Sequence, residues 1–330
     1  MPMSDNEHSI TKKIEPIISE LRTLIAKDMK ENNKINEIMR KFQSIGTWHI
    51  IDPVREVLES PNCPIRIQQK ILELFGKIQD PRVISILASY LDHDETQIRN
   101  QAIKSLSLIK NPKVTRYLIS AIESGDSDKW VKIFAVHGLT KNASPKVILP
   151  LITLLGDSEE EVRKEAILAL NKLKLDNIDE FLINALSSED RFVKFGIVNL
   201  LGERNVTKSV DALAELLGNE DLRLNMLVCN TLSKLSTPKS LIPLLDHAIK
   251  EGELPNKYLF CIQKMDKSVI SPLIDMYIRD TTNQYGESIE FILSKSGLYA
   301  HELILERKDK ESTPEFLAKL ELLENQIDKI

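Results

Sequence analysis

Histidine and cysteine, the side chains best suited to metal binding or nucleophilic chemistry, are few and scattered in this chain. The histidines are His8, His49, His93, His137, His247 and His301. No two of them have the His-x-x-x-His spacing of a helical metal site. Cys63, Cys229 and Cys261 are far apart and odd in number, which fits neither a disulfide framework nor a metal motif. We therefore predict no metal site; one assembled from different parts of the chain is the less favoured alternative.

Familiar catalytic motifs do not occur in the sequence either. There is no Gly-x-Gly-x-x-Gly loop, no Gly-Lys-Ser/Thr phosphate loop and no Gly-x-Ser-x-Gly nucleophile elbow. Carboxylates are abundant, but they concentrate in turns and on exposed faces, where a catalytic pair cannot be assigned without geometry. We therefore predict that the protein is not an enzyme, has no catalytic residues and needs no cofactor.

Charge and hydropathy limit the expected partners. The formal net charge is −5, which disfavours binding to nucleic acid because affinity for phosphates requires clustered positive charge. The first residues, MPMSDNEHS, are polar, and no run approaches the roughly 18 apolar residues of a membrane span. We expect no signal peptide, no membrane contact, reduced cysteines and a cytoplasmic location.

The elements that must position any functional side chain follow from a repeat. In DSEEEVRKEAILALNKLK, residues 157–174, Val162 is followed by Ala166 and Leu170 at offsets of four and eight, which lie on one helical face. Equivalent triplets begin at residues 67, 98, 131, 193 and 224. The six first residues, which we call anchors, are separated by 31, 33, 31, 31 and 31 residues.

A second apolar ladder with the same intervals precedes each triplet. Its members are Leu87, Leu118, Leu151, Leu182, Leu213 and Leu244. Four of these leucines follow, by seven residues, a cap residue joined to proline, a pair that favours a helix start. Short acidic turns separate the two helices, and we expect Asp126 and Asp157 to cap the second helix. Such a helix pair cannot bury its apolar face alone and must stack on its neighbours.

We therefore predict an all-α fold, an α-α superhelix of about seven to eight helical hairpins of ~31 residues. Its expected parts are a disordered N-terminus (1–8), N-terminal capping helices (9–47), regular repeats (48–252), degenerate repeats (253–306), and a charged linker with a C-terminal helix (307–330). Apolar stripes predict that the terminal helices cap the array: Ile10, Ile14, Ile17, Leu21 and Leu24, then Phe316, Leu320, Leu323 and Ile327. A homodimer through these helices is the alternative.

The stretch D…EVRKEAILAL resembles the second helix of HEAT repeats, in particular the short class also called phycobilisome-lyase HEAT-like repeats, over roughly residues 48–300. The resemblance implies an armadillo-type α-solenoid but says little about function. In this family the position after the anchor is usually basic and pairs with a turn acid. Here that position carries Arg99, Lys132, Arg163 and Lys194. We interpret these residues, with Asp126 and Asp157, as a structural ladder rather than ligand contacts.

In HEAT solenoids the second helices line the concave face. If the anchor and the residues four and eight after it face the core, positions two, six and nine after the anchor should face the groove. The residues that we predict to bind a partner there are Ile133, His137, Lys164, Leu168, Asn171, Phe195, Asn199, Met226 and Asn230. The alternative is that the apolar members pack between neighbouring helices.

The predicted function is that of a scaffold or adaptor that holds a segment of another protein. The side-chain amides of its asparagines would form hydrogen bonds with the backbone of that segment. A nucleic-acid module similar to the HEAT-like alkylpurine DNA glycosylases is the runner-up, and a lyase-like or chaperone-like factor for a cofactor-bearing protein is a weaker alternative. Deoxyhypusine hydroxylases carry several His-Glu pairs on their helices, whereas this chain has one, His301-Glu302, so that resemblance fails.

Overall fold

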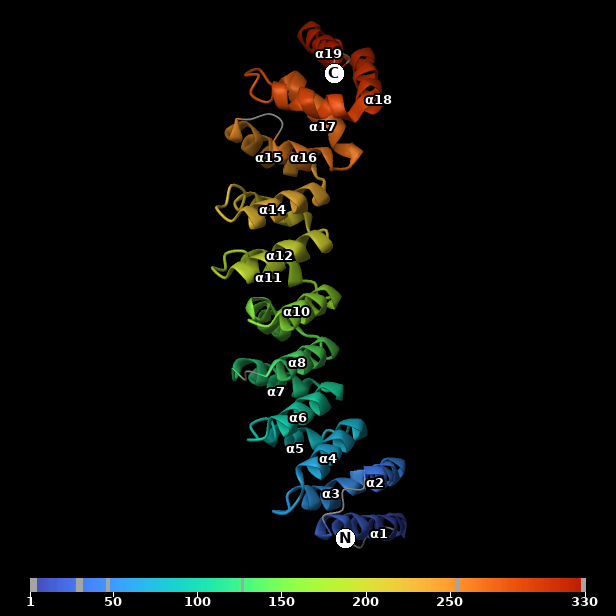
Figure 1. Ribbon diagram of the computed structural model, residues 1–330. Helices are drawn as coiled ribbons and strands as arrows, with labels where there is room; N and C mark the ends of the chain where they lie inside the picture. Colours follow the sequence, from blue (N-terminus) through green and yellow to red (C-terminus); the bar gives the residue numbers. More distant parts are fainter. Residues whose placement is uncertain (1–4, 28–31, 46–47, 126–127, 253–255, 328–330) are drawn as a thin grey trace. The chain divides into compact units, whose positions relative to one another are not determined.

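The protein is built of helices stacked in pairs (Figure 1). The computed structural model describes residues 5–27, 32–45, 48–125, 128–252 and 256–327, and within these ranges it contains no strand. The chain divides into two compact units, residues 1–178 and 179–330. Each unit is described by itself.

The first unit contains a pair of N-terminal helices followed by successive helix pairs. Its helices are α1 (Asp5–Ala26), α2 (Asn32–Ile45), α3 (Ile51–Leu58), α4 (Ile65–Ile78), α5 (Val83–Ser89), α6 (Thr96–Leu108), α7 (Pro112–Glu123), α8 (Lys129–Lys141), α9 (Ile148–Thr153) and α10 (Glu160–Lys172). Short 3-10 turns η1 (Trp48–Ile50), η2 (Pro145–Val147) and η3 (Leu154–Gly156) extend α3 and α9. The first helices are α3, α5, α7 and α9, and the second helices are α4, α6, α8 and α10.

The second unit repeats this arrangement. Its helices are α11 (Ile178–Ala185), α12 (Arg191–Glu203), α13 (Val210–Ala214), α14 (Leu222–Leu235), α15 (Pro238–Glu251), α16 (Lys257–Gln263), α17 (Ile270–Arg279), α18 (Gly286–Lys310) and α19 (Pro314–Ile327), with 3-10 turns η4 (Thr207–Ser209) and η5 (Lys267–Val269). Here α12, α14, α16 and α18 are the second helices. The prediction of an all-α solenoid of helix pairs is confirmed.

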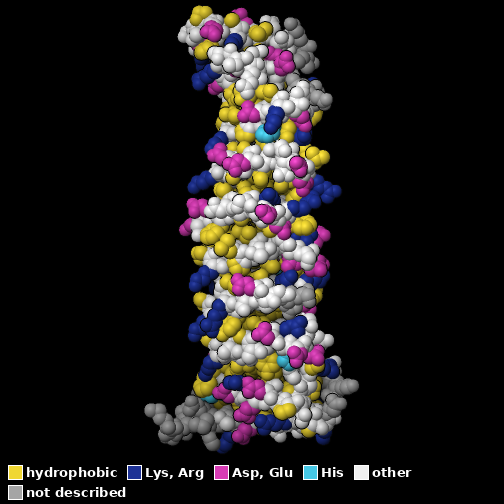
Figure 2. Space-filling view, turned by 90° about the vertical axis from the view of Figure 1, so that its left-hand side faces the viewer, with side chains coloured by type: hydrophobic (Ala, Val, Ile, Leu, Met, Phe, Trp, Pro, Cys, Tyr) yellow, Lys and Arg dark blue, Asp and Glu magenta, His cyan; other side chains and the backbone are white. Residues whose placement is uncertain are grey.

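Both apolar ladders form the core of these pairs. All six anchors are buried, and the six leucines of the first helices are fully inaccessible to solvent. Burying each such side chain contributes about 1.5–3 kcal/mol relative to leaving it in water. In the space-filling view, hydrophobic side chains appear in bands between layers of helices, while charged side chains project outward (Figure 2).

The second helices of successive pairs also pack directly against one another, α4 on α6, α6 on α8 and α8 on α10. Small residues allow this approach. A Cβ atom added to Gly138 of α8 would lie 2.5 Å from Leu118 Cδ1 and 2.9 Å from Ser107 Cα. Each second helix is therefore covered on its flanks as well as on its core side, which narrows the arc that faces solvent.

Helix starts follow the sequence signals in part. Asn111 caps α7 ahead of Pro112, and Thr237 forms a capping box with Ser240 at the start of α15. Asp157, which we expected to cap α10, lies three residues before that helix and accepts from the backbone N–H of Glu159 within the turn, at 2.9 Å. The acids that cap second helices lie three residues before the anchor: Asp128, Asp190 and Asp221. Asp126 lies outside the described residues.

The terminal helices pack on the ends of their units. Helix α1 buries Ile14, Ile18, Leu21 and Leu24, with Ile17 only half-buried, and packs on α2 and α3. Helix α19 buries Leu320, Leu323 and Ile327 and packs on α17 and α18. These contacts agree with the predicted capping role, which stays a prediction, as does the alternative of a homodimer; Leu322 of α19 is 51% exposed.

Two boundaries differ from the expected ones. Residues 5–8, expected to be disordered, belong to α1, which continues through Pro16; residues 1–4 lie outside the described part. Residues 307–310, expected in a linker, form the last turn of α18, because Arg307 pairs with Asp275, and Lys308 with Glu324 of α19 at 2.7 Å. Within α18, Gly297 has a non-helical backbone with a positive φ of 56°, which breaks the helix where glycine tolerates that geometry.

Candidate functional site

The solvent-exposed arc of the second helices is the candidate functional surface. In each unit this arc is formed by the residues one before the anchor and three, six and ten after it; we call it the second-helix face. On α8, where the anchor is Val131, these residues are Trp130, Phe134, His137 and Lys141. Offsets of four, three and four residues place them in one line along the helix.

This arc is rotated from the one expected from sequence. On α6, positions two and nine after the anchor face the next second helix: Asn100 Nδ2 donates to Asp128 Oδ2 at 3.0 Å, and Ser107 lies against Gly138. Ile133, predicted to bind a partner, occupies such a position and is only 6% exposed. For Ile133 the structure therefore contradicts the prediction of a groove position, because the flank of the helix is covered by packing.

The other predicted residues of the first unit lie at the surface. His137 and Leu168 belong to the second-helix face, while Lys164 and Asn171 are exposed beside it. His137 Nε2 lies 3.1 Å from Glu165 Oε2 of α10. Lys164 forms an exposed ion pair with Glu160 one helical turn away, at 2.5 Å.

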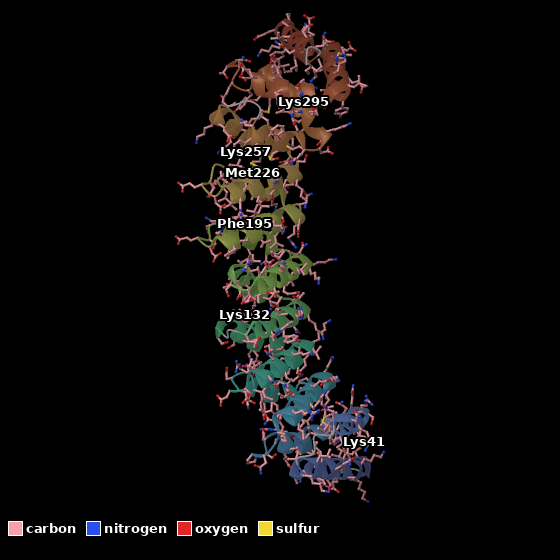
Figure 3. The ribbon with its side chains drawn as sticks, in the orientation of Figure 1. Lys41, Lys132, Phe195, Met226, Lys257 and Lys295 are labelled. Carbon is pink, nitrogen blue, oxygen red and sulfur yellow. The ribbon has the colours of Figure 1, made fainter. Side chains whose placement is uncertain are left out.

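In the second unit, the predicted residues lie on neighbouring second helices. Phe195 of α12 and Met226 of α14 follow one another, and Lys257 of α16, which was not predicted, comes next (Figure 3). Asn199 Nδ2 donates to Glu203 Oε1 at 3.0 Å, and Asn230 Oδ1 lies 3.9 Å from Cys261 Sγ. Each amide thus engages a neighbour with only part of its hydrogen-bonding capacity, which leaves further donor or acceptor positions.

The basic residues after the anchors act mainly on the turns. Lys132 Nζ lies 2.6 Å from Asp157 Oδ2, with 15% and 7% of the two side chains exposed. Arg163 donates to the carbonyls of Asp157 and Ser158 at 2.6 and 2.8 Å.

Arg99 donates to the carbonyls of His93 and Asp94 at 2.9 and 3.0 Å. Lys194 is half-buried on α12, and 25 residues beyond it stands Asn219 rather than an acid, unlike Asp157 beyond Lys132. The ladder is therefore a set of turn contacts that contains one buried ion pair among the described members.

An exposed aromatic strip on α8 was missed from the sequence. Trp130, expected to be a packing residue, is 50% exposed. Its ring centroid lies 6.1 Å from that of Phe134, which in turn meets the His137 ring edge-on at 6.4 Å. The Lys104 ammonium of α6 lies 5.7 Å from the Phe134 ring centre. The available signal was the i, i+4, i+7 spacing of three rings on a helix face away from the anchors.

A pocket of about 290 Å³ lies beside this strip, between α8 and α10. It is lined by Val136, His137, Thr140, Lys141, Glu165, Leu168, Ala169 and Lys172. Nearby, Lys129 Nζ lies 2.7 Å from Glu161 Oε1, and this contact holds the pKa of the Glu161 carboxyl below its ordinary value. The pocket therefore combines hydrophobic walls with two lysines, one glutamate and one histidine.

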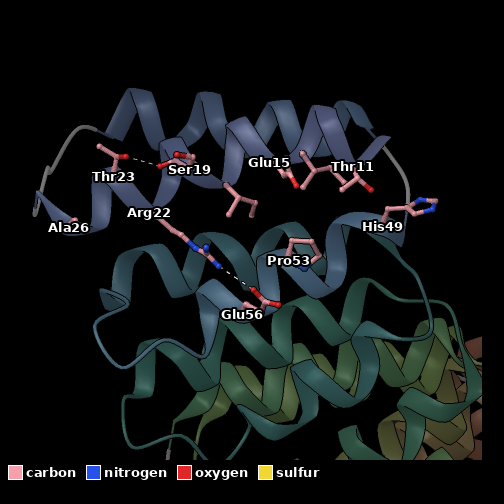
Figure 4. A pocket seen from close by; sticks show the side chains of 11 residues that line it. Thr11, Glu15, Ser19, Arg22, Thr23, Ala26, His49, Pro53 and Glu56 are labelled. Carbon is pink, nitrogen blue, oxygen red and sulfur yellow. Dashed lines mark hydrogen bonds and ion pairs between the residues drawn. The ribbon is translucent and has the colours of Figure 1, made fainter. Parts of the chain in front are cut away.

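A larger cavity of about 530 Å³ lies between α1 and the η1–α3 segment (Figure 4). It is bordered by Ile14, Ile18 and Pro53 and closed on one side by an exposed ion pair, Arg22 to Glu56 at 3.2 Å. Its walls are helix α1 and the first repeat; Thr23 donates to the carbonyl of Ser19, whereas both ring nitrogens of His49 are buried without a hydrogen-bond partner among the described residues.

Two features are absent from the described residues. Among the described residues, no group of three or more His, Cys, Asp or Glu side chains is arranged to hold a metal ion. In the same part of the chain, no helix has both the length and the apolar character that a membrane span requires.

The chain was compared with solved structures, with curated sequences and with models of protein families. Solved structures to which the chain has a partial likeness include human deoxyhypusine hydroxylase in complex with glycerol (16% identity, 78% of this chain and 98% of that chain covered, TM-score 0.35). Another is the YibA protein of Escherichia coli (18% identity, 81% of this chain and 98% of that chain covered, TM-score 0.42). A third is the complex of CpcE and CpcF of phycocyanin lyase from Nostoc sp. PCC7120 (14% identity, 77% of this chain and 94% of that chain covered, TM-score 0.39). No curated protein sequence matches this chain significantly.

The model of the family described as HEAT repeats matches this chain three times, over residues 51–128, 115–180 and 178–254. These matches cover most of the chain and coincide with helix pairs α3–α4 through α15. The chain therefore belongs to the HEAT-repeat family.

Proposed function

We propose that this protein is a non-enzymatic scaffold or adaptor that binds another protein through the second-helix face. The observation that carries this proposal is the exposure of large hydrophobic side chains on successive second helices. In the second unit, Phe192 on the second-helix face of α12 is 48% exposed, and Leu222, two residues before the anchor of α14, is 69% exposed; in the first unit, Leu168 on α10 is 48% exposed. Covering such side chains with a partner contributes about 25 cal/mol for each Å² of apolar surface removed from water.

The polar groups on this face suit recognition of a peptide. Asn199 and Asn230 each present a carboxamide that can both donate to and accept from a backbone. Phe195 is half-buried and Met226 is 37% exposed; both lie two residues after their anchors, outside the second-helix face as defined, and both are side chains of the kind that serve as anchors in interfaces. The proposed role is therefore binding, in which rigid helices hold hydrophobic and amide groups in place.

A nucleic-acid module is the second candidate, and the α8 strip is the observation in its favour. Trp130 and Phe134 could stack on bases, and lysines flank them. Glu161 and Glu165 stand on the neighbouring helix α10, however, and carboxylates there oppose a phosphate backbone. Binding to a protein is therefore the better-supported function.

The test compares partner capture by matched variants. Tagged wild-type chain and the Phe192→Ser/Leu222→Ser variant would be used for affinity purification with quantitative mass spectrometry. The control is Ile242→Ser, because Ile242 lies on a first helix, α15, and is also 48% exposed. We expect specific partners to be lost with the second-helix variant alone, at an unchanged melting temperature. Equal loss with Ile242→Ser, or retention in both variants, would place the interface elsewhere.

A further inference from the structure

The first unit carries a row of lysines near the C-terminal ends of its second helices. They are Lys77 on α4, Lys104 on α6, Lys141 on α8 and Lys172 on α10, all exposed. Lys77 contacts Glu73 at 2.7 Å, and Lys141 donates to the carbonyl of Leu108. This row contrasts with the net charge of −5 of the whole chain.

The lysine row alternates with exposed hydrophobic side chains. Leu108 lies at the end of α6 and is 39% exposed, and Leu168 lies on α10 at the rim of the α8–α10 pocket. Trp130 and Phe134 continue the hydrophobic surface along α8 toward its N-terminus. Cationic and apolar groups therefore share one surface across four side-by-side helices.

We propose that this surface binds an acidic segment of a partner protein in which carboxylate side chains alternate with hydrophobic ones; this inference rests on the proposed scaffold function. One carboxylate of the segment enters the α8–α10 pocket between Lys141 and Lys172. A hydrophobic or aromatic neighbour packs on Trp130 and Phe134. Further carboxylates meet Lys104 and Lys77 along the row.

The dimensions fit a short peptide. Neighbouring helix axes lie about 9 Å apart, so the four second helices span about 27 Å from α4 to α10. An extended chain rises about 3.3 Å per residue, so about eight to ten residues cross the surface. Recognition by several adjacent helices gives a specificity that one helix cannot provide.

Two features favour a peptide over a nucleic acid. The exposed Leu108 and Leu168 stand within the row and offer nothing to a phosphate backbone. Glu73 and Glu165, paired with Lys77 and His137, also lie along it. They oppose a nucleic acid, which carries a phosphate at every unit, whereas a peptide with carboxylates only at alternate residues can place its hydrophobic side chains and backbone N–H groups beside them.

The experiment measures fluorescence anisotropy with a fluorescein-labelled peptide of about ten residues, in which Glu or Asp alternates with Leu or Phe. The comparison probes are a peptide with Lys at the acidic positions, one with Ser at the hydrophobic positions, and single-stranded oligothymidylate. The full-length chain is used in its wild-type form and as Lys104→Glu/Lys141→Glu. The matched control is Lys113→Glu/Lys146→Glu, because both control lysines are exposed on first-helix segments of the same unit.

We expect the acidic, hydrophobic peptide to bind the wild-type chain and the control variant equally, and the Lys104→Glu/Lys141→Glu variant at least about tenfold more weakly, with affinity falling as salt rises. Trp130→Ala should also weaken binding, while Trp130→Phe should retain most of it. If the charge-reversal pair fails to fold, Lys104→Ala/Lys141→Ala gives the same comparison with a smaller change.

Three outcomes would overturn the inference: tighter binding of oligothymidylate through the same lysines, equal binding of the peptide with Ser in place of its hydrophobic residues, or equal weakening by the control pair. Failure of the acidic peptide together with partner capture that still depends on Phe192 and Leu222 would refute this inference alone. Loss of that dependence as well would refute the scaffold function.

Discussion

Replacing Lys132 by Met would test whether the basic residue after the anchor is structural. Lys132 Nζ and Asp157 Oδ2 are 2.6 Å apart, and both side chains are largely buried. At an effective dielectric constant of about 20, their attraction is about 6 kcal/mol before desolvation is subtracted. Removing one partner of a buried pair typically costs about 3–5 kcal/mol, because the other charge is left without compensation. Since Asp157 keeps a hydrogen bond from the N–H of Glu159, we expect Lys132→Met to lower the free energy of unfolding by about 3 kcal/mol.

A second substitution distinguishes two causes of destabilisation: the uncompensated charge of Asp157 and the lost packing of the Lys132 side chain. Adding Asp157→Asn to Lys132→Met removes the uncompensated carboxylate but keeps an acceptor for Glu159, so the double variant should be more stable than the single one. The matched control is Lys164→Met, because Lys164 pairs with Glu160 at 2.5 Å with both side chains mostly exposed. That change should not measurably alter stability.

The assay for these variants is urea unfolding followed by circular dichroism, combined with native-state hydrogen exchange of α8 and α10, since repeat arrays need not unfold in one step. The destabilisation should appear in the exchange of these two helices. The ion pair would not be what stabilises the turn if Lys132→Met lowered the free energy of unfolding as little as Lys164→Met. The same would follow if adding Asp157→Asn restored none of the lost stability.

Three further predictions concern packing, thiol reactivity and capping. Gly138→Ala should lower stability by about 1–3 kcal/mol in urea unfolding, because its Cβ would lie 2.5 Å from Leu118 Cδ1; an unchanged midpoint would mean that the helices separate freely. Burial raises the pKa of Cys63 to about 11, so at pH 8 only about one thiol in a thousand is ionised, and Ellman's reagent should react with it slowly in the native chain and rapidly in urea. Fast native labelling of Cys63, mapped by mass spectrometry, would contradict its burial. Thr237→Ala should cost about 0.5–2 kcal/mol by removing the capping box with Ser240, whereas Thr237→Ser should be nearly neutral if the hydroxyl is what matters.

The sequence by itself determined the repeat and its core. An anchor such as Val162 and a first-helix leucine such as Leu151 recur with one period, and both are buried. This was predictable because the core of a helix pair is local: offsets of four and eight residues fix which side chains share a face, and the period fixes which faces stack. The capping residues Asn111 and Thr237 were readable for the same reason, since a cap acts on the next few residues.

Only the tertiary structure decided which side of each second helix remains free. A helical wheel places Ile133 opposite the anchor, but the next second helix covers that flank and buries it, while Trp130 is left in solvent. Likewise, the pairing of Lys132 with Asp157, 25 residues away, depends on how one turn rests on the next helix pair. Such contacts arise between repeats rather than within one, and small residues such as Gly138 set how closely the helices approach. Local periodicity therefore identifies the side of each helix that faces the core of its own pair. Packing between neighbouring pairs determines which part of the helix surface remains exposed for a partner.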